Sequence, residues 1–120
     1  MNSNSFIETI KNHPEYDKVG MILCHNGVVR GTSRDGRRVS GLKIKVDHAK
    51  LATVIEEKKK KPGIIEILVK IVEDVDLSVG DDVMILVVAG DIRDNVIKAL
   101  HETLDVIKTT VTSKTQFYIQ

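Results

Sequence analysis

Several residue types that support common chemistries are scarce in this chain of 120 residues. Its single cysteine, Cys24, excludes an intrachain disulfide, a C-x-x-C redox pair and a cysteine-rich zinc site. Tryptophan is absent and aromatic residues make up 3%, so the stacking surfaces of single-stranded nucleic-acid binders are largely missing. A lone thiol is typical of a reducing compartment, and we expect a cytoplasmic protein.

Strong net charge and long apolar runs are also missing. Eighteen lysines and arginines stand against 17 acidic residues, and the net charge of +1 gives no general attraction to nucleic acid or an anionic membrane. No stretch approaches the roughly 18 apolar residues of a membrane helix, and residues 1–5 do not resemble a signal peptide. Hydrophobic residues nevertheless make up 42%, so we expect one folded domain over residues 1–120 that binds neither nucleic acid nor membrane.

The N-terminal quarter of the chain predicts a short helix followed by strands. Apolar residues recur at helical spacing before Pro14. The apolar run at residues 19–24 has the length of a strand, and it resumes at Val28. Asn26-Gly27 between the two parts favours a hairpin, although a glycine within one strand can also mark a bulge or a close approach of backbone to ligand.

The middle of the chain predicts a strand, a helix and two further strands. Residues 42–46 alternate apolar and lysine side chains, as a strand with one solvent-exposed face does. Asp47 then caps a helix that ends at Pro62-Gly63. Residues 64–71 predict a strand buried mainly on one face, whereas residues 83–89, apolar at every position, predict a central strand covered on both faces.

The C-terminal part contains the clearest helical pattern. We expect Asp91 to cap this helix, and its apolar stripe recurs at spacings of three and four: Ile92, Val96, Leu100, Leu104 and Ile107. The β-branched residues at 109–112 disfavour further helix, and a final strand is expected over residues 117–119. Strands that often follow one another directly predict an α+β fold with a mainly antiparallel sheet and about three helices packed on it.

Four arginines form the densest charged cluster, in a loop that also contains two glycines: Arg30, Arg34, Arg37 and Arg38. Guanidinium groups bind phosphate or carboxylate in a bidentate manner, and glycines let backbone amides approach an anion. The loop could therefore hold a phosphorylated ligand. The alternative is a solvated hairpin tip, because charged residues beside turns are common.

Two lysines flank the junction between the last helix and the final strand. In a dry pocket near other cations, Lys108 or Lys114 would lose its proton more easily, and the neutral amine could act as nucleophile or general base. A lysine at the end of a helix also simply complements the helix dipole, and both interpretations remain open here.

The remaining candidates for site chemistry give negative predictions. The four histidines, at positions 13, 25, 48 and 101, form neither an H-x-x-x-H nor an H-E-x-x-H spacing, so we predict no metal site. Cys24 and His25 are adjacent in a predicted strand and should point to opposite faces, which disfavours a thiolate–imidazole pair. Cys24 is therefore predicted to be a buried structural thiol.

Taken in order, several segments resemble the large subunit of molybdopterin synthase, the MoaE family. Gly27-Val28-Val29-Arg30 matches the family's G-x-V-R strand end, and a polar, glycine-containing loop and the strand at residues 42–46 follow it. Gly80-Asp81, the apolar strand and a helix that opens near Arg93 match the family's G-[DE] turn, central strand and H-R helix start. Lys108 falls where the family has a lysine at the end of that helix, and the similarity runs from about residue 19 to residue 114.

The resemblance implies a fold of the α/β hammerhead kind and a sulfur-transfer reaction. In that family a ubiquitin-like small subunit (MoaD-like) inserts a thiocarboxylated Gly-Gly tail into the large subunit, and two sulfurs pass to cyclic pyranopterin monophosphate. The pterin is substrate and product, so no cofactor is expected. By resemblance, Arg30 and Arg93 would contact the anionic substrate or tail, Lys108 would be the principal catalytic lysine, and all three would converge on one pocket. A homodimer within a heterotetramer is also expected.

Other parts of the pattern are weaker or depart from the family. Arg34, Arg37 and Arg38 lie in the corresponding loop without matching an individual family motif. Ile92 stands where the family's H-R pair has histidine, and the spacing from Lys108 to Lys114 is one residue short of the family's second lysine. A one-residue shift turns a strand residue to the other face. These departures motivate an alternative function, a catalytically impaired module that binds a pterin phosphate or a Gly-Gly-tailed partner.

Overall fold

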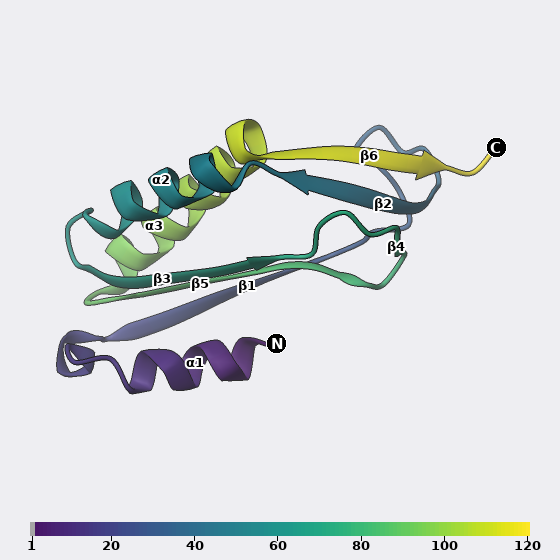
Figure 1. The fold of residues 1–120 in the computed structure, drawn as a ribbon. Coiled ribbons are helices and arrows are strands. Elements are labelled where there is room, and N and C mark those ends of the chain that lie inside the picture. The colour runs from purple at the N-terminus through teal and green to yellow at the C-terminus, as the bar shows by residue number, and fades with distance from the viewer. Residues whose placement is uncertain (1) are drawn as a thin grey trace.

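Two three-stranded antiparallel sheets form the framework of the computed structural model, which describes residues 2–120 (Figure 1). The first sheet has the order β1-β5-β3 and the second the order β4-β2-β6. The strands are β1 (Met21–Val28), β2 (Val39–Val46), β3 (Ile64–Ile71), β4 (Leu77–Ser78), β5 (Asp82–Gly90) and β6 (Thr112–Tyr118). The α+β class is confirmed, although the strands form two sheets instead of one.

Three α-helices cover the first sheet on both faces. Figure 1 shows α1 (Ser3–Lys11) on one face and α2 (His48–Lys59) together with α3 (Arg93–Val106) on the other. A 3-10 turn, η1 (Tyr16–Lys18), leads into β1, and a π-helical turn, η2 (Ile107–Val111), joins α3 to β6. Across residues 2–120, none of the helices combines the length and apolarity that crossing a bilayer requires.

The central strand β5 is buried because each of its faces meets a different helix layer. Leu86 and Val88 pack in the cluster on the α3 side, whereas Ile85, Val87 and Ala89 pack with Phe6 and Ile10 of α1 on the other side. Residues 84–90 are all buried. Successive strand residues alternate between faces, so a strand apolar at every position needs this double cover, as the sequence predicted.

The predicted hairpin at Asn26-Gly27 is wrong. Both residues lie inside β1, which pairs along its whole length with β5, and the pairing register shifts between Gly27 and Val28. The alternative, a glycine that marks a bulge within one strand, therefore describes this segment. Cys24 was also wrongly predicted, because it is exposed and not a buried thiol.

Helix boundaries follow local capping in one case and depart from it in another. The carboxylate of Asp47 accepts a hydrogen bond of 3.1 Å from the backbone N–H of Lys50 and caps α2, as predicted. The N-cap of α3 is Ile92, one residue later than the predicted Asp91, and no side chain caps this helix. Ile92 is 55% exposed and therefore does not belong to the buried stripe of α3, which begins at Val96.

Candidate functional site

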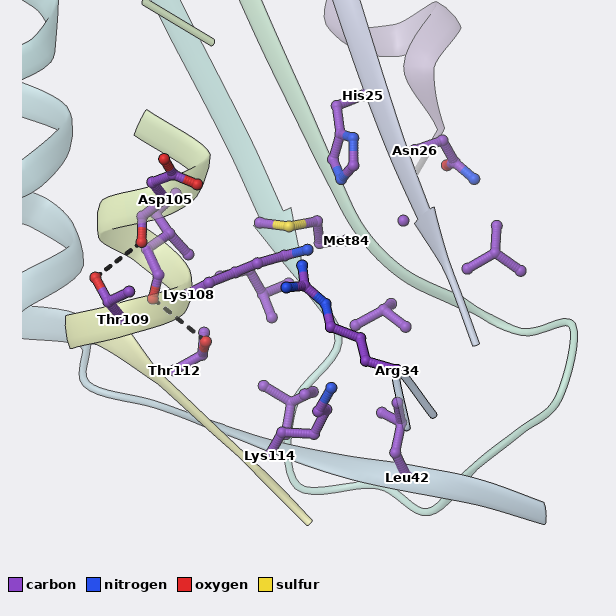
Figure 2. A pocket seen from close by; sticks show the side chains of 16 residues that line it. His25, Asn26, Arg34, Leu42, Met84, Asp105, Lys108, Thr109, Thr112 and Lys114 are labelled. Carbon is purple, nitrogen blue, oxygen red and sulfur yellow. Dashed lines mark hydrogen bonds between the residues drawn. The ribbon is translucent and has the colours of Figure 1, made fainter. Parts of the chain in front are cut away.

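A cavity of about 680 Å³ lies where the two sheets meet the C-terminal end of α3 (Figure 2). Its apolar wall comes from β2, β3 and β5 and belongs to the hydrophobic cluster between the sheets. Its polar side chains come from β1, the arginine loop, the end of α3, η2 and β6. The lining residues are His25, Asn26, Gly27, Val28, Arg34, Leu42, Ile44, Ile71, Val83, Met84, Asp105, Ile107, Lys108, Thr109, Thr112 and Lys114.

Lys108 enters the cavity from the π-helical turn that ends α3. The threonines at 109, 110 and 112 return their hydroxyls to the backbone: Thr109 donates to the carbonyl of Asp105 at 2.9 Å and Thr110 to that of Val106 at 2.7 Å. These bonds accompany the π-helical turn, and the β-branched segment continues the helix to Val111, contrary to the prediction. Figure 2 shows the Lys108 side chain extending across the cavity toward Met84.

Lys114 reaches the same cavity from β6. It lies opposite Ile44 of β2, and Thr112 lies opposite Val46, so these side chains share one face of the second sheet. Ile44, Thr112 and Lys114 all line the cavity. The shortened spacing from Lys108 therefore does not turn Lys114 away from the site.

Arg34 is the member of the arginine loop that lines the cavity, and Figure 2 shows its guanidinium group pointing inward. The loop around it is ordered by local bonds. The carboxylate of Asp35 accepts hydrogen bonds from the Ser33 hydroxyl and from the backbone N–H of Arg37, which lower the pKa of Asp35. Gly36 has φ of 86°, a left-handed conformation that favours glycine at this turn.

The other three loop arginines do not line the cavity. The Nε of Arg30 donates a 2.8 Å hydrogen bond to the carbonyl of Thr32. Arg37 stacks on the ring of Tyr118, with the guanidinium carbon 3.6 Å from the ring centroid. Arg38 forms an isolated β-bridge with Thr32. The interpretation of the loop as a solvated hairpin tip therefore fits these three residues, whereas Arg34 fits the ligand-binding interpretation.

Arg93 is also remote from the cavity of its own chain. It begins α3, whereas Lys108 lies beyond the end of that helix, and a rise of 1.5 Å for each of the intervening residues separates their backbones by about 22 Å. Within one chain, the expected convergence of Arg30, Arg93 and Lys108 is therefore wrong. The group that the fold does gather is Arg34, Lys108 and Lys114.

His25 is a cavity residue that the sequence prediction missed. Residues opposite each other in an antiparallel pair share a face, and His25 lies opposite Leu86, which packs toward α3. Its Nε2 atom is buried without a hydrogen-bond partner. Burial and the positive charge of Lys108 both lower the pKa of His25. The alternation of strand residues implied that Cys24 and His25 point apart, but not which face would meet a cavity.

The cavity is suited to an anionic ligand. Three cationic side chains, from Arg34, Lys108 and Lys114, line it together with one carboxylate, that of Asp105. The carboxylate of Asp105 lies 3.3 Å from Nε2 of His101, and among residues 2–120 no salt bridge engages the three cations. Over the same residues, no group of three or more His, Cys, Asp or Glu side chains is arranged to hold a metal ion.

The fold and the cavity define an α+β protein with a cationic pocket, and sequence comparison places it in a family. The family model described as MoaE protein matches residues 2–110, most of the chain. The chain belongs to the MoaE family. This membership supports a role in molybdenum cofactor biosynthesis. Among curated proteins, no sequence matches the chain significantly.

Solved structures show the same fold. The molybdopterin synthase of Staphylococcus aureus matches with a TM-score of 0.80 at 20% identity, over 100% of this chain and 87% of the other. A complex of subunits 1 and 2 of the molybdopterin-converting factor of Helicobacter pylori gives 0.71 at 16% identity, over 100% and 85%. The molybdopterin biosynthesis MoaE protein of Burkholderia ambifaria gives 0.75 at 14% identity, over 98% and 83%.

Proposed function

We propose that this chain is the large subunit of a molybdopterin synthase. It would transfer sulfur from the thiocarboxylated C-terminus of a ubiquitin-like small subunit to cyclic pyranopterin monophosphate. The observation that carries the proposal is the presence of Arg34, Lys108 and Lys114 around one cavity in a member of the MoaE family. Lys108 is the lysine that the family resemblance marks as catalytic.

The size and charge of the cavity support a pterin phosphate as its ligand. Ligand cavities for small molecules measure roughly 300–1,000 Å³, and this cavity has about 680 Å³. The phosphate would pair with Arg34, whose guanidinium group can form two parallel hydrogen bonds to its oxygens. The apolar wall of Leu42, Ile44 and Met84 would contact the flat pterin ring.

The two lysines would act on the atoms that react. Lys108 extends across the cavity and would transfer protons or position the thiocarboxylate next to the pterin carbon that accepts sulfur. Lys114, on the facing sheet, would balance negative charge that develops during transfer. No metal or resident cofactor takes part in this proposal, because the pterin is the substrate.

The proposal includes a small-subunit partner and a homodimer. A structure of similar fold from Helicobacter pylori contains two different subunits, which supports a partner for this chain. A homodimer would also give Arg93 a role. The backbone of Arg93 lies about 22 Å from that of Lys108, and Arg93 does not line the cavity of its own chain, so the second copy would supply it.

Reconstitution tests the proposal. The chain is mixed with a thiocarboxylated Gly-Gly-tailed small subunit and cyclic pyranopterin monophosphate, and the dithiolene product is measured. We expect product formation that saturates with the small subunit. Absence of product at every concentration would remove the proposal.

One observation favours a second candidate, a module that binds without catalysis. Ile92, at the position of the family's histidine, places an exposed apolar side chain beside Arg93. Calorimetry distinguishes the two candidates: binding of the pterin phosphate or the tailed partner with no product formed supports the module, whereas multiple turnovers exclude it.

A further inference from the structure

The imidazole of His25 is a polar group in the cavity that the proposed reaction does not use. It lies on the central part of β1, and Figure 2 shows the far end of its ring directed toward the amine of Lys108. Its Nε2 atom is buried and has no hydrogen-bond partner. A Cβ atom at Gly27 would lie 3.4 Å from Nε2, in ordinary van der Waals contact, so the glycine leaves about the volume of a methyl group beside the ring.

A buried polar atom without a partner destabilises the empty site. Such a group costs free energy because it has given up water without a replacement, and native structures usually retain it for a ligand or a function. No hydrogen bond joins Nε2 to the nearby Lys108, and the charge of Lys108 disfavours a second positive charge on the ring. An anion bound between the two would remove this conflict.

We propose that His25 is a proton-coupled anion-binding residue: when a tetrahedral oxyanion enters the cavity, the imidazole ring turns so that Nε2 faces the anion, takes up a proton, and donates a hydrogen bond to the anion through Nε2–H. The proton comes from solvent, and no covalent bond forms or breaks. The inference deepens the proposed function and rests on it for the identity of the ligand, the phosphate of a pterin. The site itself requires only an oxyanion.

The charged groups around His25 support proton uptake once an anion is bound. Lys108 of η2 extends toward the ring in Figure 2, and Arg34 of the loop, Lys114 of β6 and the carboxylate of Asp105 at the end of α3 line the same cavity. The paired strand β5 contributes the apolar Leu86 and Met84. A doubly charged anion offsets the fields of the three cations, so protonated His25 becomes favourable where it was disfavoured in the empty cavity.

The predicted pH dependence has a definite sign. In the empty site, burial and Lys108 hold the pKa of His25 below its ordinary value of 6.5. The anion raises it, so affinity for the anion increases as the pH falls toward the raised pKa. Each unit by which the anion raises this pKa makes binding about tenfold tighter at the low-pH limit than at the high-pH limit.

Sulfate is the appropriate probe, because it is a tetrahedral dianion that does not itself titrate near neutral pH. Sulfate binding to the full chain is measured at constant ionic strength by calorimetry at pH 7, in two buffers with different ionisation enthalpies. The difference between the heats gives the number of protons taken up, and we expect a value between zero and one. NMR of the histidine ring protons in the unmodified chain should show the pKa of His25 rising with sulfate.

Two variants test the assignment. His25→Gln keeps a hydrogen-bonding side chain but cannot titrate, and should abolish proton uptake and make sulfate affinity independent of pH. His48→Gln is the matched control: His48 is 69% exposed, pairs with Glu73 and lies outside the cavity, so wild-type proton uptake should persist. Sulfate binding without proton uptake, or no sulfate binding at all, would overturn the inference.

The same proteins separate this inference from the proposed function. Proton-coupled sulfate binding without dithiolene product would leave the His25 site standing and remove the synthase proposal. Product formation by a chain whose sulfate binding takes up no proton would remove the His25 inference and leave the synthase proposal standing.

Discussion

Pairs of inactive variants test whether the expected homodimer supplies Arg93 to the cavity of the partner copy. Arg93→Ala and Lys108→Ala are coexpressed with different tags, and the mixed dimer is purified through both. In this dimer one cavity combines the intact Lys108 of the first chain with the intact Arg93 of the second, and the other cavity lacks both groups. Because a two-fold dimer has two equivalent sites, sulfur transfer should return to about half of the wild-type rate per dimer.

The expectation that Arg93 acts across the dimer follows from the separation along α3. About 22 Å separates the backbones of Arg93 and Lys108 in one chain, and Arg93 does not line the cavity of its own chain. The control reverses the arrangement by pairing a wild-type chain with the double variant. Each of its cavities then lacks one group, and it should be inactive. If the first dimer were inactive and the second about half active, Arg93 would act within its own chain and the reasoning would be refuted.

Three further perturbations test local features by thermal or urea unfolding. Thr103 is fully buried and its hydroxyl lacks a partner, so Thr103→Val should raise the free energy of unfolding by about 1 to 3 kcal/mol, and a lower melting temperature would contradict this. Asp47→Ala removes the cap of α2 and should cost about 1 kcal/mol in urea unfolding, whereas no change would show that the cap is dispensable. The pKa of His25 is lowered in the folded state, so the unfolded chain binds the proton first as pH falls below 6.5. The wild type should therefore lose unfolding free energy relative to His25→Gln between that pH and the lowered pKa. Parallel curves of unfolding free energy against pH would argue against this.

The parts of the fold that local chemistry dictates were predictable from sequence. Asp47 caps α2 because its carboxylate needs only the N–H three residues ahead. β5 was identified as central because seven consecutive apolar residues require cover on both faces. In both cases the decisive neighbours are close in sequence or follow from simple alternation.

One error arises where distant segments decide the structure. Asn26-Gly27 has the local signal of a hairpin, but residues 21–28 pair with β5, almost 60 positions later, and this pairing overrides the turn preference. The π-helical turn at 107–111 was missed for a local reason, because the threonine hydroxyls bond to carbonyls four residues earlier, which β-branching alone does not reveal.

The site was predictable where the local position of a residue in the chain selected it. Lys108 and Lys114 were selected by their place at the helix–strand junction, and Arg34 by its place in a glycine-containing loop. The sequence did not separate Arg34 from Arg37, since stacking on Tyr118 depends on where β6 ends. His25 carried no motif, and its role depends on which face of β1 meets η2.

Single-turnover sulfur transfer in Lys108→Ala tests the central claim most directly. The variant is compared with the wild type and with Lys98→Ala, a matched control whose exposed lysine on α3 does not line the cavity. With the thiocarboxylated small subunit and the pterin in excess over their dissociation constants, Lys108→Ala should slow dithiolene formation by at least about 10²-fold and Lys98→Ala should leave it unchanged. Equal rates for all three proteins would contradict the assignment of sulfur transfer to this cavity.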